Sequence, residues 1–107
     1  MAATLINDPV LVRFRQALDV AYRNRIERVA LFGSRARGDA HAESDYDVAV
    51  FLWSLPDRWA ELDRLAALRV RLIDGIGAFI DIKPYPAGAY REHTALMHEI
   101  RQDGIDL

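Results

Sequence analysis

Three acidic residues on two short β-rich segments could together bind a divalent cation. Asp45 and Asp47 open an apolar run that ends at Leu52, and Asp81 lies within a second run, residues 78–84. Side chains alternate along a strand, so Asp45 and Asp47 share one face. Like charges this close repel each other, and a cation between them relieves the repulsion. If the two strands are neighbours, Asp81 joins this surface, and three oxygen ligands with water and phosphate oxygens suit Mg²⁺.

A glycine-serine pair upstream of these acids could hold phosphate groups. Gly33 and Ser34 end an apolar run, residues 26–32, that is typical of a buried strand. Glycine lets the backbone approach a ligand or take a positive φ, and serine favours the start of a helical turn, where backbone N–H groups attract anions. Arg35 and Arg37 add positive charge. Each half alone has an ordinary explanation, a turn or a pair of solvated acids; together they indicate a phosphate site beside a metal site.

Periodicity and capping residues predict the elements that must position these side chains. Trp53 and Trp59 are expected mainly in the core, with partner contacts as the alternative. The expected elements are a helix over residues 8–22, strands over 26–32, 45–52 and 78–84, a helix from a capping box at 54–57 to the glycines at 75 and 77, a turn at 84–88, and a helix over 89–102 closed by Gly104.

These elements predict an α/β (α+β) fold in which helices pack on a small mixed sheet that carries the acids at one edge. The chain of 107 residues is long enough for one hydrophobic core, and it contains no repeat or linker. We therefore expect a single domain over residues 1–107, with no room for a second substrate-binding lobe.

Composition excludes several classes of function. The net charge of −2 argues against a long nucleic-acid substrate, which usually demands a basic face, but it is compatible with a mononucleotide. The chain has no cysteine, so it has neither disulfides nor a thiolate metal site. No signal peptide or apolar run of membrane-spanning length is evident, which favours a cytoplasmic location without membrane contact.

The spacing of the two motifs resembles that of a known family. Gly33-Ser34, ten residues, Asp45-x-Asp47 and Asp81 on a later strand are similar to the nucleotidyltransferase signature of the DNA polymerase β superfamily. The string GSRARGDAHAESDYDVAV and the ending Glu99–Gly104 resemble the minimal nucleotidyltransferase (MNT) proteins of prokaryotic HEPN/MNT toxin–antitoxin pairs. The resemblance extends from Ile26 onward. A tyrosine between the two acids and His41 in the loop depart from the usual pattern, but neither removes a ligand.

The resemblance implies an antitoxin that transfers AMP from ATP to a hydroxyl, most simply a tyrosine, of a partner HEPN ribonuclease toxin and thereby silences it. It implies that Asp45 and Asp47 ligate two Mg²⁺ ions, that Asp81 binds the catalytic metal and assists deprotonation of the hydroxyl, and that Gly33 and Ser34 hold the β,γ-phosphates. Arg35 or Arg37 would assist.

Two other interpretations stay open. A non-catalytic antitoxin would neutralise its partner by binding alone and keep the fold as a scaffold. A small-molecule nucleotidyltransferase of the aminoglycoside type would need a second domain or a dimer to complete its site. The sequence leaves open the acceptor, the base preference, the number of AMP units added and the oligomeric state, including a homo-oligomer.

Overall fold

The computed structural model describes residues 8–40, 45–76 and 79–107 of the chain, without the side chains of residues 73–76. His41, Gly77 and Ala78, which the sequence analysis assigned to a loop, a helix end and a strand start, lie outside the described residues. The elements in chain order are α2 Pro9–Tyr22, η1 Arg23–Arg25, β1 Ile26–Phe32, α3 Ser34–Arg37, β2 Tyr46–Leu52, α4 Arg58–Ile76, β3 Ile80–Pro86, η2 Ala89–Arg91, α5 Ala95–Asp103 and β4 Ile105–Asp106.

The strands form one mixed sheet in the order β3-β2-β1-β4. β1 pairs antiparallel with both β2 and β4, whereas β2 and β3 run parallel, with α4 in the connection between them. This arrangement confirms the small mixed sheet and the three strands predicted from sequence. β4 was not predicted, because two residues are too short for any periodic pattern to show.

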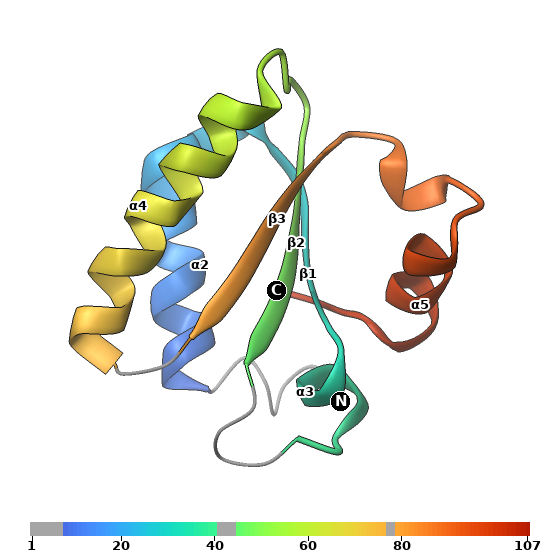
Figure 1. Ribbon diagram of the computed structural model, residues 1–107, viewed down its shortest axis with the longest axis horizontal. Helices are drawn as coiled ribbons and strands as arrows, with labels where there is room; N and C mark the ends of the chain where they lie inside the picture. The colour runs from blue at the N-terminus through green and yellow to red at the C-terminus, as the bar shows by residue number, and fades with distance from the viewer. Residues whose placement is uncertain (1–7, 41–44, 77–78) are drawn as a thin grey trace.

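Helices cover both faces of the sheet (Figure 1). α2 and α4 lie together on one face, and α5 lies on the other. The first face carries the larger apolar cluster, formed by Leu11, Phe14, Leu18, Tyr22, Val29, Leu31, Tyr46, Val48, Val50, Leu52, Leu65, Leu68, Leu72, Ile80 and Ile82. The second face carries Ala30, Phe32, Ala49, Phe51, Ala89, Met97 and Ile100.

β2 divides its side chains between these two clusters as its alternation predicts. Tyr46 and Val48 pack toward α2 and α4, while Ala49 and Phe51 pack toward α5. Asp47 has the parity of Ala49, so its side chain lies on the α5 face. The sheet therefore presents its acidic residues on the face opposite the two long helices.

α2 begins as the sequence predicts. The Asp8 carboxylate accepts a hydrogen bond from the backbone N–H of Val10 at 2.9 Å, and Pro9 occupies the first turn. This is the expected capping arrangement, because proline has no N–H to leave unsatisfied there. The cap fixes the entry of the chain into its first helix.

Three predicted boundaries are wrong. α4 begins at Arg58 rather than at the Ser54 capping box, because Asp57 accepts from the N–H of Ala60 at 3.2 Å and caps the helix. β3 continues through the expected turn to Pro86, which the edge position of this strand permits. The last helix, α5, begins only at Ala95, where the Thr94 hydroxyl accepts from the N–H of Met97; residues 89–91 form a separate 3₁₀ turn.

The assignment of both tryptophans to the core is also wrong. Trp53 is 65% exposed and Trp59 is 78% exposed. Trp53 follows β2 directly, beyond the end of the packed sheet, and Trp59 lies in the first turn of α4 on the side away from the core. No helix among the described residues has the length and apolar character required to cross a membrane.

Candidate active site

Two of the predicted acidic residues are direct neighbours across the parallel pair of strands. Asp47 of β2 stands in register with Asp81 of β3, and the next pair on the same face is Ala49 with Lys83. Neighbouring strands lie about 4.8 Å apart, so the two carboxyl groups share one patch of the sheet. Asp45 lies immediately before β2 and is exposed. The prediction that Asp81 meets the acidic pair on one surface is confirmed for Asp47.

The electrostatics of this patch disfavour three free carboxylates. Burial raises the pKa of Asp47, and the negative charges of Asp81 and Asp45 raise it further, while Lys83 opposes the rise. The Lys83 ammonium lies 3.9 Å from the Asp81 carboxylate. A single lysine does not neutralise the cluster, so the patch retains an affinity for added positive charge.

Gly33 lies next to the Asp47 side chain, on the side of β1. Its φ of +76° lies in a region that side chains rarely adopt, and a Cβ built on it would overlap the Oδ2 atom of Asp47. Phe32, the residue before it, stands in register with Asp47. The Gly33 carbonyl then accepts from the N–H groups of Ala36 and Arg37 and starts α3 at Ser34. The expected positive φ and the expected helical turn are both present, directly beside the acid.

The two loop arginines diverge, because residues two apart on a helix point to different sides. The Arg35 guanidinium lies over the Tyr46 ring, 4.0 Å from its centroid. Tyr46 belongs to the α2 and α4 face, and its hydroxyl donates to Asp8 at 2.9 Å. Burial, and next this bond to the carboxylate, raises the pKa of Tyr46. Arg35 is therefore held on the face opposite Asp47.

Arg37 is oriented toward the α5 face. It pairs with Asp39 at 3.3 Å and reaches Glu99 of α5 at 4.0 Å. The Glu99 charge also contributes to the raised pKa of Asp47, which places Glu99 in the field of the acidic patch. Of the two arginines, Arg37 is therefore the one that lies on the same face of the sheet as Asp47, where Glu99 interacts with both residues.

Glu99 has no role predicted from the sequence, where it is only part of the C-terminal stretch Glu99–Gly104. The residue adjoins Ile100, which is fully buried on the α5 face of the sheet. The spacing between Glu99 and the other acids in the sequence does not predict that they lie close together, because α5 reaches the site through tertiary packing. Its only signal in the sequence is its position in the predicted last helix beside the apolar residue Ile100.

The residues present fit a magnesium ion delivered with a nucleotide. Within the described ranges, no three Asp, Glu, His or Cys side chains are arranged as a complete metal centre. Mg²⁺, however, is usually held by one or two carboxylates together with water and substrate phosphates. Asp47 and Asp81 supply such a pair, and burial together with the negative charges of Asp81 and Asp45 raises the pKa of Asp47. Their roles, and those of Gly33 and Ser34, stay predictions.

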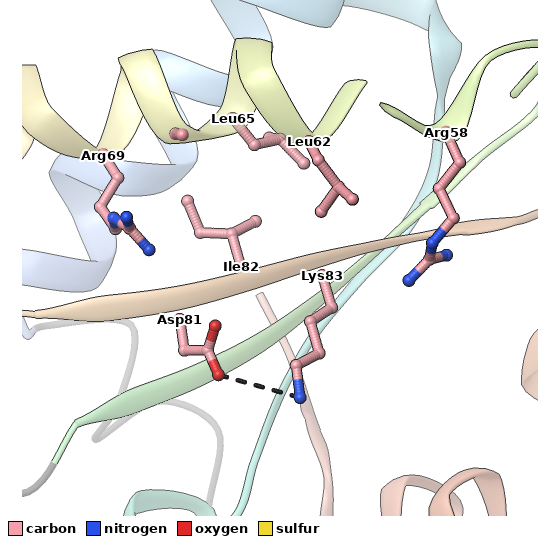
Figure 2. Close-up of a pocket in the computed structure, with 8 residues that line it drawn as sticks. Arg58, Leu62, Leu65, Arg69, Asp81, Ile82 and Lys83 are labelled. Atoms are coloured by element: carbon pink, nitrogen blue, oxygen red, sulfur yellow. Dashed lines mark ion pairs between the residues drawn. The ribbon is translucent and has the colours of Figure 1, made fainter. Parts of the chain in front are cut away.

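A groove adjoins the acidic patch at the outer strand of the sheet. The groove lies between α4 and β3 (Figure 2). Its volume is about 300 Å³. Asp81 and Lys83 project from β3 on one side of the strand, and Ile82 points toward Leu62 and Leu65 of α4. The described residues that line it are Arg58, Leu62, Leu65, Ala66, Arg69, Asp81, Ile82 and Lys83. No feature noted in the sequence predicted this groove.

Solved structures similar to this one share its fold. A candidate minimal nucleotidyltransferase is 27% identical, with a TM-score of 0.60 over 92% of each chain. A toxin–antitoxin structure with AMP-PNP is 19% identical, with a TM-score of 0.60 over 94% of this chain and 71% of the other. A complex of a tri-AMPylated Shewanella oneidensis HEPN toxin with its MNT antitoxin is 16% identical, with a TM-score of 0.55 over 91% of this chain and 70% of the other.

Two relatives by sequence are proteins of Methanocaldococcus jannaschii, each named as a candidate protein adenylyltransferase. MJ0141 is 36% identical over 47 residues, which make up 44% of this chain and 48% of that protein. MJ0604 is 44% identical over 43 residues, or 40% of this chain and 43% of that protein. The matched segment thus spans less than half the length of either relative. The sequence model of the family described as "Polymerase beta, Nucleotidyltransferase" matches residues 16–107. The chain belongs to the polymerase beta nucleotidyltransferase family.

Proposed function

We propose that this chain, as a single domain over residues 1–107, is a Mg²⁺-dependent adenylyltransferase that transfers AMP from ATP to a hydroxyl of a protein. Family membership supports the reaction class. The names of the Methanocaldococcus relatives support a protein as the acceptor. The observation that carries the proposal is the in-register pair of Asp47 and Asp81, with Gly33 packed against Asp47.

Each residue of the site has a distinct role in this reaction. Asp45 and Asp47 would hold two Mg²⁺ ions with the nucleotide, and Asp81 would hold the catalytic ion. Bound Mg²⁺ supplies Lewis-acid polarisation of the α-phosphate and charge neutralisation for the leaving pyrophosphate. The backbone at Gly33 and Ser34 positions the β,γ-phosphates, because glycine alone permits this close approach.

Asp81 orients the acceptor hydroxyl and accepts its proton. The hydroxyl oxygen forms a bond to the α-phosphorus while the bond from that phosphorus to the bridging oxygen breaks. The protein contributes position and charge rather than covalent chemistry. Arg37 leaves the half-buried Glu99 and the exposed Asp39, which hold it weakly, and pairs with the triphosphate.

We further propose that the acceptor is a tyrosine of a HEPN toxin and that the chain acts as its antitoxin in the cytoplasm. The structures with related folds include toxin–antitoxin complexes, one of them with a tri-AMPylated HEPN toxin. Burial and the charges of Asp81 and Asp45 raise the pKa of Asp47, so keeping the three acids together is unfavourable without a cation. This cost counts against a non-catalytic antitoxin that acts by binding alone.

The test measures the intact mass of a HEPN protein encoded beside this chain, after incubation with the full chain, ATP and Mg²⁺. We expect a gain of one or more AMP units, absent with Asp47→Asn or Asp81→Asn. Asp63→Asn is the matched control, because it makes the same charge change on an exposed position of α4. Unaltered transfer by both site variants would refute the mechanism.

A further inference from the structure

The groove between α4 and β3 lies on the opposite side of Asp47 from the glycine-serine loop. In the sheet order β3-β2-β1, Asp47 stands on the middle of these three strands, with Gly33 at the end of β1 and Asp81 on β3. The groove extends outward from Asp81 along β3. A nucleotide whose phosphates rest at Gly33 therefore leaves this groove open to the second substrate.

The lining of the groove combines an apolar floor with cationic walls. Leu62, Leu65, Ala66 and Ile82 form the floor. Among the described residues of the lining, three are cationic, Arg58, Arg69 and Lys83, and one is acidic, Asp81, although the whole chain carries a net charge of −2. The groove is thus a local concentration of positive charge on an acidic protein. Charge of this kind selects acidic partners.

Two of the three cations, Arg58 and Arg69, are held in place by contacts at the rim. Arg58 donates to the Pro84 carbonyl and lies 5.3 Å from the centre of the Tyr85 ring. The Arg69 guanidinium lies 4.8 Å from the centre of the Phe79 ring, and that ring is itself exposed. Guanidinium groups already stacked on aromatic faces need little ordering to meet a ligand.

The position of β3 favours an extended peptide as the occupant. β3 is the outer strand of the sheet, and outer strands pair with added extended segments. Pro84 and Pro86 lie in its far half, where they limit such pairing. The half that remains suited to pairing contains Asp81 and adjoins the reaction centre. A pocket near 300 Å³ is at the small end for ligand sites and suits one side chain.

We propose that this groove binds an acidic segment of the partner protein and directs its acceptor hydroxyl to Asp81. The proposal rests on the function proposed above, because Asp81 receives the hydroxyl proton there. The side chain that carries the hydroxyl lies on the apolar floor, and its acidic flanking residues pair with Arg58 and Arg69. Recognition of the acceptor thus resides in this domain and not in a second lobe.

The test measures binding of three fluorescent peptides to the full chain without nucleotide. The peptides share a central tyrosine and differ in flanking residues, which are Glu, Gln or Lys. We expect the Glu peptide to bind about tenfold more tightly than the Gln peptide, and the Lys peptide more weakly still. Arg69→Glu reduces binding of the Glu peptide to that of the Gln peptide, whereas Arg71→Glu, the same charge change on an exposed position of α4, leaves it unchanged.

A second measurement separates this proposal from the proposed function. The rise in melting temperature with Mg²⁺ and ATP should be the same in the wild type, Arg69→Glu and Arg71→Glu. If Arg69→Glu removes that rise and leaves peptide affinity unchanged, the groove holds the triphosphate and the proposal is overturned. Equal affinity for the three peptides, or no binding, also overturns it. Peptide binding in a chain that shows no response to Mg²⁺ and ATP refutes the nucleotidyltransferase function alone. If the Arg69→Glu variant does not fold, Arg69→Gln takes its place in both measurements.

Discussion

Gly33 lies so close to Asp47 that a side chain at position 33 would occupy the place of the Asp47 carboxylate oxygen. This close approach lies between the end of β1 and the start of β2, where the glycine-serine loop begins. A side chain at position 33 is therefore incompatible with the observed position of the Asp47 carboxylate. Glycine is thus required at position 33 for two reasons: its positive φ, and the space that the Asp47 carboxylate occupies.

Replacement of Gly33 by alanine should cost both stability and nucleotide binding. The strained φ costs about 1–3 kcal/mol, which lowers the melting temperature by about 4–8 °C per kcal/mol in a domain of this size. The added methyl group also displaces the Asp47 carboxylate, so the response to Mg²⁺ and ATP should be lost. Gly38→Ala is the control, because Gly38 has a φ of +86° but open space around it. It should lose stability and keep the response. A full response in Gly33→Ala would contradict this displacement.

Asp47→Asn should stabilise the protein at neutral pH when divalent cations are absent. Burial and the charges of Asp81 and Asp45 raise the pKa of Asp47 above its ordinary value of 3.8, so the folded state binds the proton more tightly than the unfolded state. The wild type then loses stability as pH rises from 3.8 through the raised pKa. Asparagine carries no charge, so it avoids this loss.

Melting temperatures in a chelator at several pH values test this sign. The advantage of Asp47→Asn should be largest at neutral pH and shrink toward pH 4, while Mg²⁺ should stabilise the wild type and not the variant. Asp63→Asn, on the exposed side of α4, should show neither effect. A variant less stable than the wild type in chelator at pH 7 would mean that the acidic patch is not under repulsion.

Local chemistry allowed much of the fold to be predicted. β1 has the predicted bounds, and the Asp8-Pro9 cap starts α2, because both depend on residues adjacent in sequence. The face of Asp47 followed from the alternation of β2. The position of Asp81 beside it needed only the assumption that the two strands are neighbours, which the parallel pairing satisfies.

Features that depend on tertiary contacts were missed. β4 is held by pairing with β1 and has no pattern of its own. Glu99 reaches the site through the packing of α5. Arg35 and Arg37 were treated as equivalent, although Tyr46 holds one and Glu99 attracts the other. Sequence spacing contains no information on which side of a four-residue helix faces the acids.

Tyr46→Phe should lower stability without altering the arginine contact. The Tyr46 hydroxyl donates to the Asp8 carboxylate that also caps α2, so its removal costs about 1 kcal/mol. Phenylalanine keeps an aromatic face for Arg35, whereas Tyr46→Leu removes both contacts. Melting temperatures should therefore fall in the order wild type, Tyr46→Phe, Tyr46→Leu, with activity close to that of the wild type in the phenylalanine variant. Equal stability of tyrosine and phenylalanine would show that the hydroxyl bond does not support the helix cap.

Both tryptophans should behave as solvent-exposed residues in the folded protein. Trp53 and Trp59 are 65% and 78% exposed, so their emission spectrum should change little in wavelength when denaturant unfolds the chain. Each should be accessible to a soluble quencher before unfolding. Trp53→Ser and Trp59→Ser should change stability by no more than about 0.5 kcal/mol. A large red shift on unfolding would indicate that an indole is covered in solution, for example by a second copy.

The contribution of Glu61 to the free energy of unfolding should change with pH in the opposite sense to that of Asp47. It is 6% exposed, and it accepts hydrogen bonds from Tyr22 at 2.9 Å and Arg25 at 2.7 Å. Burial alone would raise the pKa of Glu61, but these two bonds and the neighbouring arginine charges lower it below its ordinary value of 4.5. The unfolded state therefore binds the proton more tightly, so the contribution is complete above pH 4.5 and is lost as pH falls through the folded-state pKa. Glu61→Gln should cost about 2 kcal/mol at pH 7, and the cost should diminish in acid. Urea unfolding at pH 7 and pH 3.5 measures the difference, and a cost that does not fall with pH would show that the Glu61 charge contributes nothing.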